Sequence, residues 1–163
     1  MEGKDLTQHN GANHLNNPLL QQNRPPLSLE ELLFKSIYFV NEGPEIGMHI
    51  SFEILKSFCI PEIYTVIITH IENMVVYAVQ NYPTYNVYLN LKGITITSID
   101  KYRDFIMKCS TAMLKHGEYY NQLQFIYVIQ APTFLKQLLT IMKTITPYII
   151  NNIKIVPNEK KNK

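Results

Sequence analysis

The sequence is poor in the residues that most often mark a redox, phosphate-binding or nucleic-acid-binding site. It has no tryptophan, two cysteines and six glycines among 163 residues, and its formal net charge is only +2. The two thiols, Cys59 and Cys109, lie far apart and form no Cys-x-x-Cys pair, which is typical of reduced cysteines in the cytoplasm. The small net charge is far below the excess of lysine and arginine that binds a nucleic-acid backbone. These features argue against a disulfide scaffold and against a nucleic-acid partner.

Sequence motifs for nucleotide, phosphate, hydrolase and zinc-protease sites are also absent. The chain contains no G-x-G-x-x-G, G-x-x-x-x-G-K-[ST], G-x-S-x-G or H-E-x-x-H. Glu72 is two residues from His70 and faces another side of the helix, so the two side chains do not form a catalytic or metal-binding pair. His70 is therefore interpreted as a histidine at the edge of the core. Cys109 is interpreted as a small buried apolar residue rather than a nucleophile. We therefore expect no enzyme activity, no catalytic residue, no metal ion and no cofactor.

The chain divides into three parts of different composition. Residues 1–27 form a polar leader that we expect to be disordered, residues 28–157 hold one domain, and residues 158–163 form a short basic tail. The leader lacks the apolar segment of a signal peptide. The apolar runs at 64–79 and 145–156 are interrupted by polar residues and are too short to cross a bilayer. We expect a cytoplasmic protein that meets membranes only at their surface.

The hydrophobic spacing alternates between helical and extended segments. Ser28 and Glu31 form a capping box that starts a helix, and residues 36–40 are either a short strand or the end of that helix. Thr97 and Asp100 give a second capping signal. This pattern predicts an α/β fold with a mainly parallel or mixed sheet of four to five strands and helices packed on it, with 86–91 and 125–129 as central neighbours. The helices are predicted at 61–81, from Thr97 to near 115, and at 133–145, and the strands at 86–91, 124–130 and 153–156.

Two short stretches in this order resemble the CRAL-TRIO lipid-binding domain family. The Asn-Leu-Lys-Gly sequence at 90–93 is similar to a family strand that ends in Asp-Leu-x-Gly. The Gln-Ala-Pro sequence at 130–132 is similar to the Asn-Ala-Pro of the family, and the spacing between the two motifs fits. The resemblance covers roughly residues 61–156. It implies an α/β cup whose sheet is the floor of an apolar pocket for one phospholipid, retinoid or tocopherol-like molecule.

The resemblance also implies a mobile gate helix, and residues 133–145 occupy its position. An ordinary core helix packed on the sheet would bury the same apolar face, so both interpretations stay open. Asn121 stands where the phosphatidylinositol-binding branch has an acidic residue, which argues against recognition of an inositol headgroup. The expected function is the non-catalytic binding of a hydrophobic ligand such as a phospholipid. Transfer of that ligand is an extension of this function.

The candidate ligand-binding residues fall into two sets. The expected pocket walls are Val87, Leu89, Leu91, Phe125, Tyr127, Ile129, Phe134, Leu135, Leu138 and Met142. The expected contacts to a headgroup or to a transient membrane surface are Thr97, Ser98, Asn121, Lys136 and Lys143.

A protein-interaction module of the same fold, with a collapsed pocket and a protein partner, is the alternative function. In that case Tyr88, Phe125 and Tyr127 would point inward and fill the cup. The sequence does not decide which face of its strand each of these aromatic residues occupies.

Overall fold

A computed structural model describes residues 26–115, 117–135, 137, 139, 140, 143 and 152–157 of the chain. The predictions for the polar leader up to residue 25 and for the basic tail at 158–163 fall outside these residues. The same holds for Lys136, Leu138 and Met142, which were expected in the gate helix.

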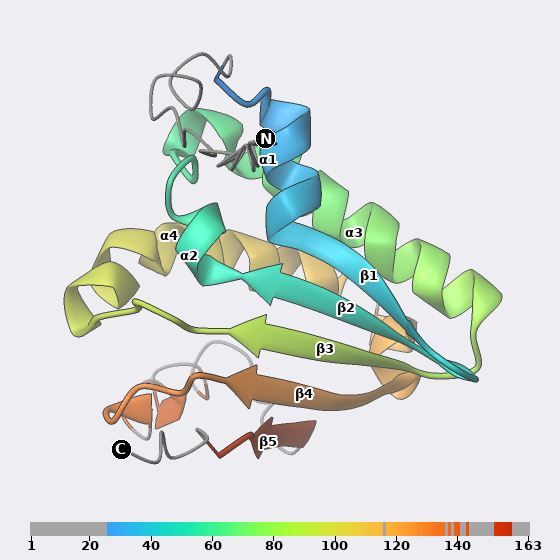
Figure 1. The fold of residues 1–163 in the computed structure, drawn as a ribbon. Helices are drawn as coiled ribbons and strands as arrows, with labels where there is room; N and C mark the ends of the chain where they lie inside the picture. The colour runs from blue at the N-terminus through green and yellow to red at the C-terminus, as the bar shows by residue number, and fades with distance from the viewer. Residues whose placement is uncertain are drawn as a thin grey trace, which may run out of the picture.

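The described chain forms an α/β fold built on a five-stranded mixed sheet in the order β1-β2-β3-β4-β5 (Figure 1). Only the pairing of β1 with β2 is antiparallel, and the other three pairings are parallel. The predicted fold class and the central pairing of β3 with β4 are confirmed. The strands are β1 (Ile37–Glu42), β2 (Glu45–Ser51), β3 (Tyr85–Asn90), β4 (Leu123–Ile129) and β5 (Ile153–Ile155).

Helices connect and cover these strands. Ser28 caps α1 as predicted: its hydroxyl accepts from the Glu31 amide at 3.2 Å, and its own amide donates to the Glu31 carboxylate at 2.8 Å. Residues 135, 137, 139, 140 and 143 are helical, which agrees with the helix predicted at 133–145. The remaining helices are α1 (Leu29–Ser36), α2 (Phe52–Leu55), α3 (Tyr64–Asn81) and α4 (Ile96–Leu114), with short 3-10 helices η2 (Pro61–Ile63) and η3 (Gly117–Asn121).

Two local features differ from the sequence prediction. Strand β2 was not predicted, although Ile46, Met48 and Ile50 alternate along it and Gly43, at φ +82°, makes the tight turn that pairs it with β1. The helix cap of α4 is Thr95 rather than Thr97. Thr95 has extended backbone angles and its hydroxyl accepts from the Ser98 amide at 3.1 Å, whereas Thr97 already lies inside the first turn.

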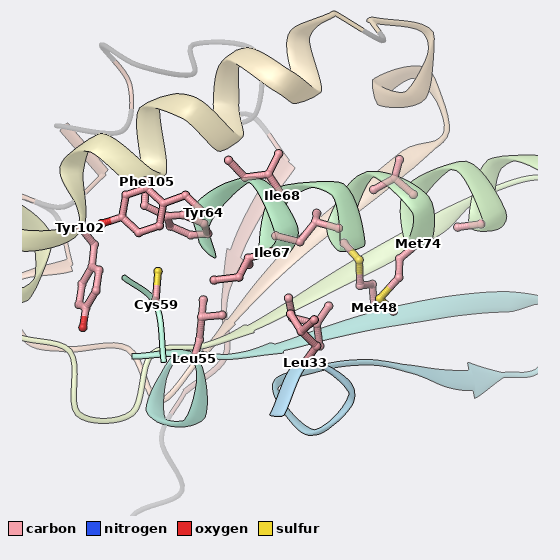
Figure 2. Close-up of a cluster of buried hydrophobic side chains, with 14 of the residues drawn as sticks. Leu33, Met48, Leu55, Cys59, Tyr64, Ile67, Ile68, Met74, Tyr102 and Phe105 are labelled. Carbon is pink, nitrogen blue, oxygen red and sulfur yellow. The ribbon is translucent and has the colours of Figure 1, made fainter. Parts of the chain in front are cut away.

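The main hydrophobic core lies between the sheet and helices α1, α3 and α4. In α3, residues Ile67, Ile71, Met74, Val75 and Ala78 share one buried face, so packing holds a helix that is rich in β-branched residues. Figure 2 shows this face of α3 directed toward residues of β2, α1 and α2. We call the helix-covered side of the sheet the inner face, and the opposite side the outer face.

Candidate functional site

An apolar cavity lies between the inner face of the sheet and helices α3 and α4. Its volume is about 270 Å³. One end is bordered by Tyr85 and Tyr120, near the amino ends of β3 and β4, and the other by Leu91, Ile94 and Ser98, beyond the carboxyl end of β3. The long walls come from aliphatic residues of β2, β3 and β4 and from helix residues that include Ile71, Val75, Tyr102, Phe105 and Ile106.

Four of the predicted pocket residues line this cavity. Val87, Leu89 and Leu91 border it from β3 and the turn that follows, and Leu135 borders it from the helix after β4. Phe134 packs beside Leu135 in a second hydrophobic cluster but does not line the cavity.

Three residues that were expected in a pocket wall, Phe125, Tyr127 and Ile129, do not line this cavity. Residues Ile126 and Val128 line the cavity instead, so their neighbours in β4 point to the outer face. The cause is a bulge in β4. Tyr85 pairs with Leu123, but the next inner residue of β3, Val87, pairs with Ile126, so β4 contains one extra residue and its alternation changes phase.

The outer face carries a row of stacked rings that crosses four strands. The ring centroids are 5.2 Å apart for Tyr38 and His49, 4.5 Å for His49 and Tyr88, and 4.9 Å for Tyr88 and Tyr127, with nearly parallel planes. We call these four residues the ring ladder. At its β5 end the Lys154 ammonium lies 3.1 Å from the centroid of Phe125. Tyr88, Phe125 and Tyr127 therefore stand outside the cavity and do not fill it.

The predicted polar contacts are scattered. Ser98 lines the cavity while it completes the α4 capping box with Thr95, but Thr97, Asn121 and Lys143 are exposed and do not line it. The structure instead brings Lys56, which follows α2, to the cavity. No spacing signal in the sequence identifies this lysine, because the fold alone brings the end of α2 beside the turn after β3.

Lys56 stands at the end of the cavity where strand β3 finishes. Its Nζ lies 3.0 Å from the position that a Cβ on Gly93 would occupy, and 6.0 Å from the ring centroid of Phe52. Within the described part of the chain, no carboxylate forms an ion pair with it. Gly93 has φ +73°, a backbone conformation that favours glycine.

Two thiols and two tyrosine hydroxyls beside the cavity are neutral near pH 7. Burial raises the pKa of the Cys59 thiol to about 11 and that of the Cys109 thiol to about 12. Burial likewise raises the pKa of Tyr85 and raises that of Tyr120 to about 12. Thiols with such raised pKa values are poor nucleophiles near neutral pH.

Hydrogen bonding differs among the tyrosines of the cavity. The Tyr85 hydroxyl donates to the Tyr119 carbonyl at 3.2 Å, and the Tyr102 hydroxyl donates to the Lys56 carbonyl at 3.1 Å. The Tyr120 hydroxyl oxygen is buried and has no hydrogen-bond partner among the described residues.

His70 is half-buried, packs edge-on against Phe34 with ring centroids 5.3 Å apart, and does not line the cavity. The described residues contain no group of three or more histidine, cysteine, aspartate or glutamate side chains placed to hold a metal ion. In the same part of the chain, no helix has the length and hydropathy that crossing a bilayer requires.

The fold is similar to that of a solved structure reported as the crystal structure of Sfh5. The TM-score is 0.52 with 12% sequence identity, over 86% of this chain. The match spans 52% of the Sfh5 chain, so this protein corresponds to about half of that structure. Neither family models nor curated protein sequences give a match to this chain. At this identity the similarity establishes the fold.

Proposed function

We propose that this protein binds a slender hydrophobic molecule, such as a single-chain lipid or one chain of a phospholipid, in the cavity between sheet and helices. The observation that carries the proposal is the cavity of about 270 Å³ with almost entirely apolar walls. An apolar cavity of about 150 Å³ is already large enough to stay dry and bind benzene. An open space of this kind in an otherwise close-packed core is unfavourable unless a ligand fills it.

The length of the cavity suits an extended hydrophobic ligand. It follows β3 from Tyr85 at the amino end to Leu91 beyond the carboxyl end, a distance of roughly 20 Å at about 3.3 Å per residue. A cavity of about 270 Å³ along that length has room for an extended hydrocarbon chain. The sequence resemblance to the CRAL-TRIO family, together with a fold similar to that of Sfh5, supports a lipid as the ligand.

Entry is proposed at the carboxyl ends of the strands, where open α/β sheets commonly bind ligands. The helix after β4 covers this region through Leu135 and Leu139, which pack in one cluster with Leu91, Ile99 and Val128. Movement of this helix would open the cavity, and Lys56 would then lie beside the entering molecule. Transfer between membranes and contact with a membrane surface are extensions of this proposal.

In the alternative function, a protein-interaction module with a collapsed pocket, inward aromatic side chains could fill the cup. Tyr88, Phe125 and Tyr127 lie on the outer face, and the cavity is open beside Val87, Leu89 and Val128. We therefore favour ligand binding over the collapsed-pocket alternative.

The proposal is tested by looking for bound lipid and for stabilisation by added lipid. Protein purified from a eukaryotic host is analysed by native mass spectrometry, and the released ligands are identified after solvent extraction. The unfolding free energy of lipid-free protein should then rise by about 2.7 kcal/mol when a matching ligand is added at about 100 times its Kd. A purified protein without lipid, together with no stabilisation across a broad panel of single-chain and two-chain lipids, would refute the proposal.

A further inference from the structure

The ammonium of Lys56 stands at the rim of the apolar cavity. Lys56 is exposed and lines the cavity, and its Nζ lies 3.0 Å from the position that a Cβ on Gly93 would occupy. Gly93 follows Leu91 and precedes Ile94, and these two residues border the same end of the cavity. A lysine can lay its methylenes along an apolar wall while its charged tip stays in contact with water. The rim therefore offers a positive charge that is accessible from solvent and adjacent to an apolar space.

The main chain of Lys56 is fixed by two hydrogen bonds. Its amide donates to the Phe52 carbonyl at 3.0 Å, and its carbonyl accepts from the Tyr102 hydroxyl at 3.1 Å. Phe52 belongs to α2, Tyr102 belongs to α4, and both residues line the cavity. The base of the side chain is thus held at the cavity, and only rotations of the side chain can move the ammonium along the rim.

The nearby groups do not neutralise this ammonium. Glu53 forms an ion pair with Lys92 at 2.9 Å, and among the described residues no carboxylate pairs with Lys56. The Phe52 ring centroid lies 6.0 Å from Nζ, which is the outer limit of a cation–π contact. Ser98, which lines the same end, uses its hydroxyl in the α4 capping box. Lys56 therefore remains able to bind an anion.

We propose that the ligand is a single-chain amphiphile whose anionic head group, a carboxylate or a phosphodiester, binds the Lys56 ammonium at the rim while its hydrocarbon chain occupies the cavity. The inference rests on the proposed function, because it specifies the ligand of the same cavity. A head group at the rim keeps part of its hydration, so its charge does not carry the cost of burial among apolar walls. Hydrogen bonds between an ammonium and an oxyanion are stronger than those between neutral groups.

The test compares probes that differ in charge on the same chain. Dodecanoate and methyl undecyl ketone share an undecyl chain and a carbonyl group, and a methyl group of the ketone replaces the charged oxygen of the acid. Undecyl methyl phosphate carries a phosphodiester on that chain. The Kd of each probe is measured near neutral pH by equilibrium dialysis with mass spectrometry, for the unaltered full chain and for each variant.

The decisive variant is Lys56→Met, which removes the charge and keeps an apolar side chain. Lys92→Met is the matched control, because it lowers the charge of the same end by the same amount but alters a lysine that is paired with Glu53 and does not line the cavity. Lys56→Arg keeps the charge, and Lys56→Gln removes it with a polar side chain. Lys56 is exposed, so these substitutions leave the core intact.

The informative quantity is the Kd of an anionic probe divided by the Kd of the ketone. Lys56→Met and Lys56→Gln should raise this ratio by about three- to tenfold, because they remove a charge-assisted hydrogen bond. Lys56→Arg should change it by less than about twofold, since a guanidinium also binds oxyanions. Lys92→Met should likewise change it by less than about twofold, because an exposed charge is screened by salt.

The two anionic probes distinguish the sources of the head group. A rise in the ratio for dodecanoate alone supports the inference and identifies a fatty acid as the ligand class. A rise for undecyl methyl phosphate alone supports it and identifies a single-chain phospholipid. A rise for both supports it for either head group.

The failures of this inference and of the proposed function are distinguishable. If none of the probes binds the full chain, the cavity does not take such ligands and both proposals are wrong. If the ketone binds and Lys56→Met leaves the ratio unchanged for both anions, the cavity binds hydrophobic molecules but Lys56 does not select an anionic head group. A rise for Lys92→Met equal to that for Lys56→Met would mean that the general charge of this end attracts the anion, which also overturns the inference.

Discussion

The two faces of the sheet are made by alternate residues of the same strands, yet they are built in different ways. On the inner face, aliphatic side chains such as Val87, Leu89 and Val128 pack under helices and leave a cavity open. On the outer face, the ring ladder runs from Tyr38 to Tyr127, and none of the helices that the structure describes packs against it. The difference shows that cross-strand stacking and helix packing are separate means of stabilising one sheet.

This division has a consequence for ligand binding. Aromatic cross-strand pairs contribute about 0.5 to 1.5 kcal/mol each beyond the area that they bury. Three such pairs on the outer face help to hold the strands together without any contribution from the inner face. The inner face can therefore retain an open cavity, and the bulge in β4 keeps Phe125 and Tyr127 out of it.

The comparison is tested most strongly by truncating adjacent residues of β1 that point to opposite faces. Ile37 is fully buried, whereas Tyr38 at the end of the ring ladder is 42% exposed. Ile37→Ala should lower the free energy of unfolding by about 2 to 5 kcal/mol, because it removes core contacts and leaves a void. Tyr38→Ala should lower it by about 1 kcal/mol, because it loses one stacked ring pair.

Urea unfolding monitored by circular dichroism measures both values. Equal losses for the two variants would mean that the outer face is as important for stability as the core. A loss for Tyr38→Ala larger than that for Ile37→Ala would contradict the assignment of the core to the inner face.

The sequence predicts most of the fold because its strongest signals are local. The capping box at Ser28 and the helical spacing from Ile67 to Ala78 do not depend on distant residues, and both are present in the structure. The inner position of Val87 and Leu89 also follows from simple alternation along β3.

The site is predicted only in part because it depends on contacts between distant segments. The bulge that reverses the faces of β4 exists only in the pairing with β3, so Phe125 and Tyr127 could not be placed from their own neighbours. Lys56 and Tyr120 come to the cavity from α2 and η3 through the packing of the whole domain. Neither residue belongs to a periodic pattern that would have selected it.

A smaller expected effect is a loss of stability at high pH, which depends on the exclusion of water from the inner face. Burial raises the pKa of Cys59 to about 11 and that of Cys109 to about 12, above the value of 9.0 for a free thiol. The protonated thiols are therefore favoured in the folded state. The contribution of the two thiols to the free energy of unfolding is fully present below pH 9 and is lost as the pH rises from about 9 to about 12.

The expected loss is about 1.4 kcal/mol for each thiol by about pH 10, where the unfolded thiols ionise and the folded thiols do not. The double variant Cys59→Ala with Cys109→Ala should show a flatter decline in stability over this range, measured by urea unfolding at each pH. The remaining slope would come from the buried tyrosines Tyr85 and Tyr120, whose pKa values are also raised. If the unfolding free energy of the double variant falls with pH as steeply as that of the unaltered protein, the two thiols are not shielded from water in the folded state.

The central claim, that the inner face binds a hydrophobic molecule and the outer face does not, is tested most directly by substituting phenylalanine for one residue on each face of β3. Val87→Phe places a larger side chain in the cavity, and Tyr88→Phe keeps the stacked ring on the outer face. The measurement is the Kd for a ligand identified from the purified protein, or for methyl undecyl ketone. We predict that Val87→Phe weakens binding at least about tenfold while its unfolding free energy stays the same or rises by about 0.5 to 2 kcal/mol, as expected for a filled cavity. Tyr88→Phe should bind as the unaltered protein does. Unchanged binding by Val87→Phe, or loss of binding by Tyr88→Phe, would contradict the claim.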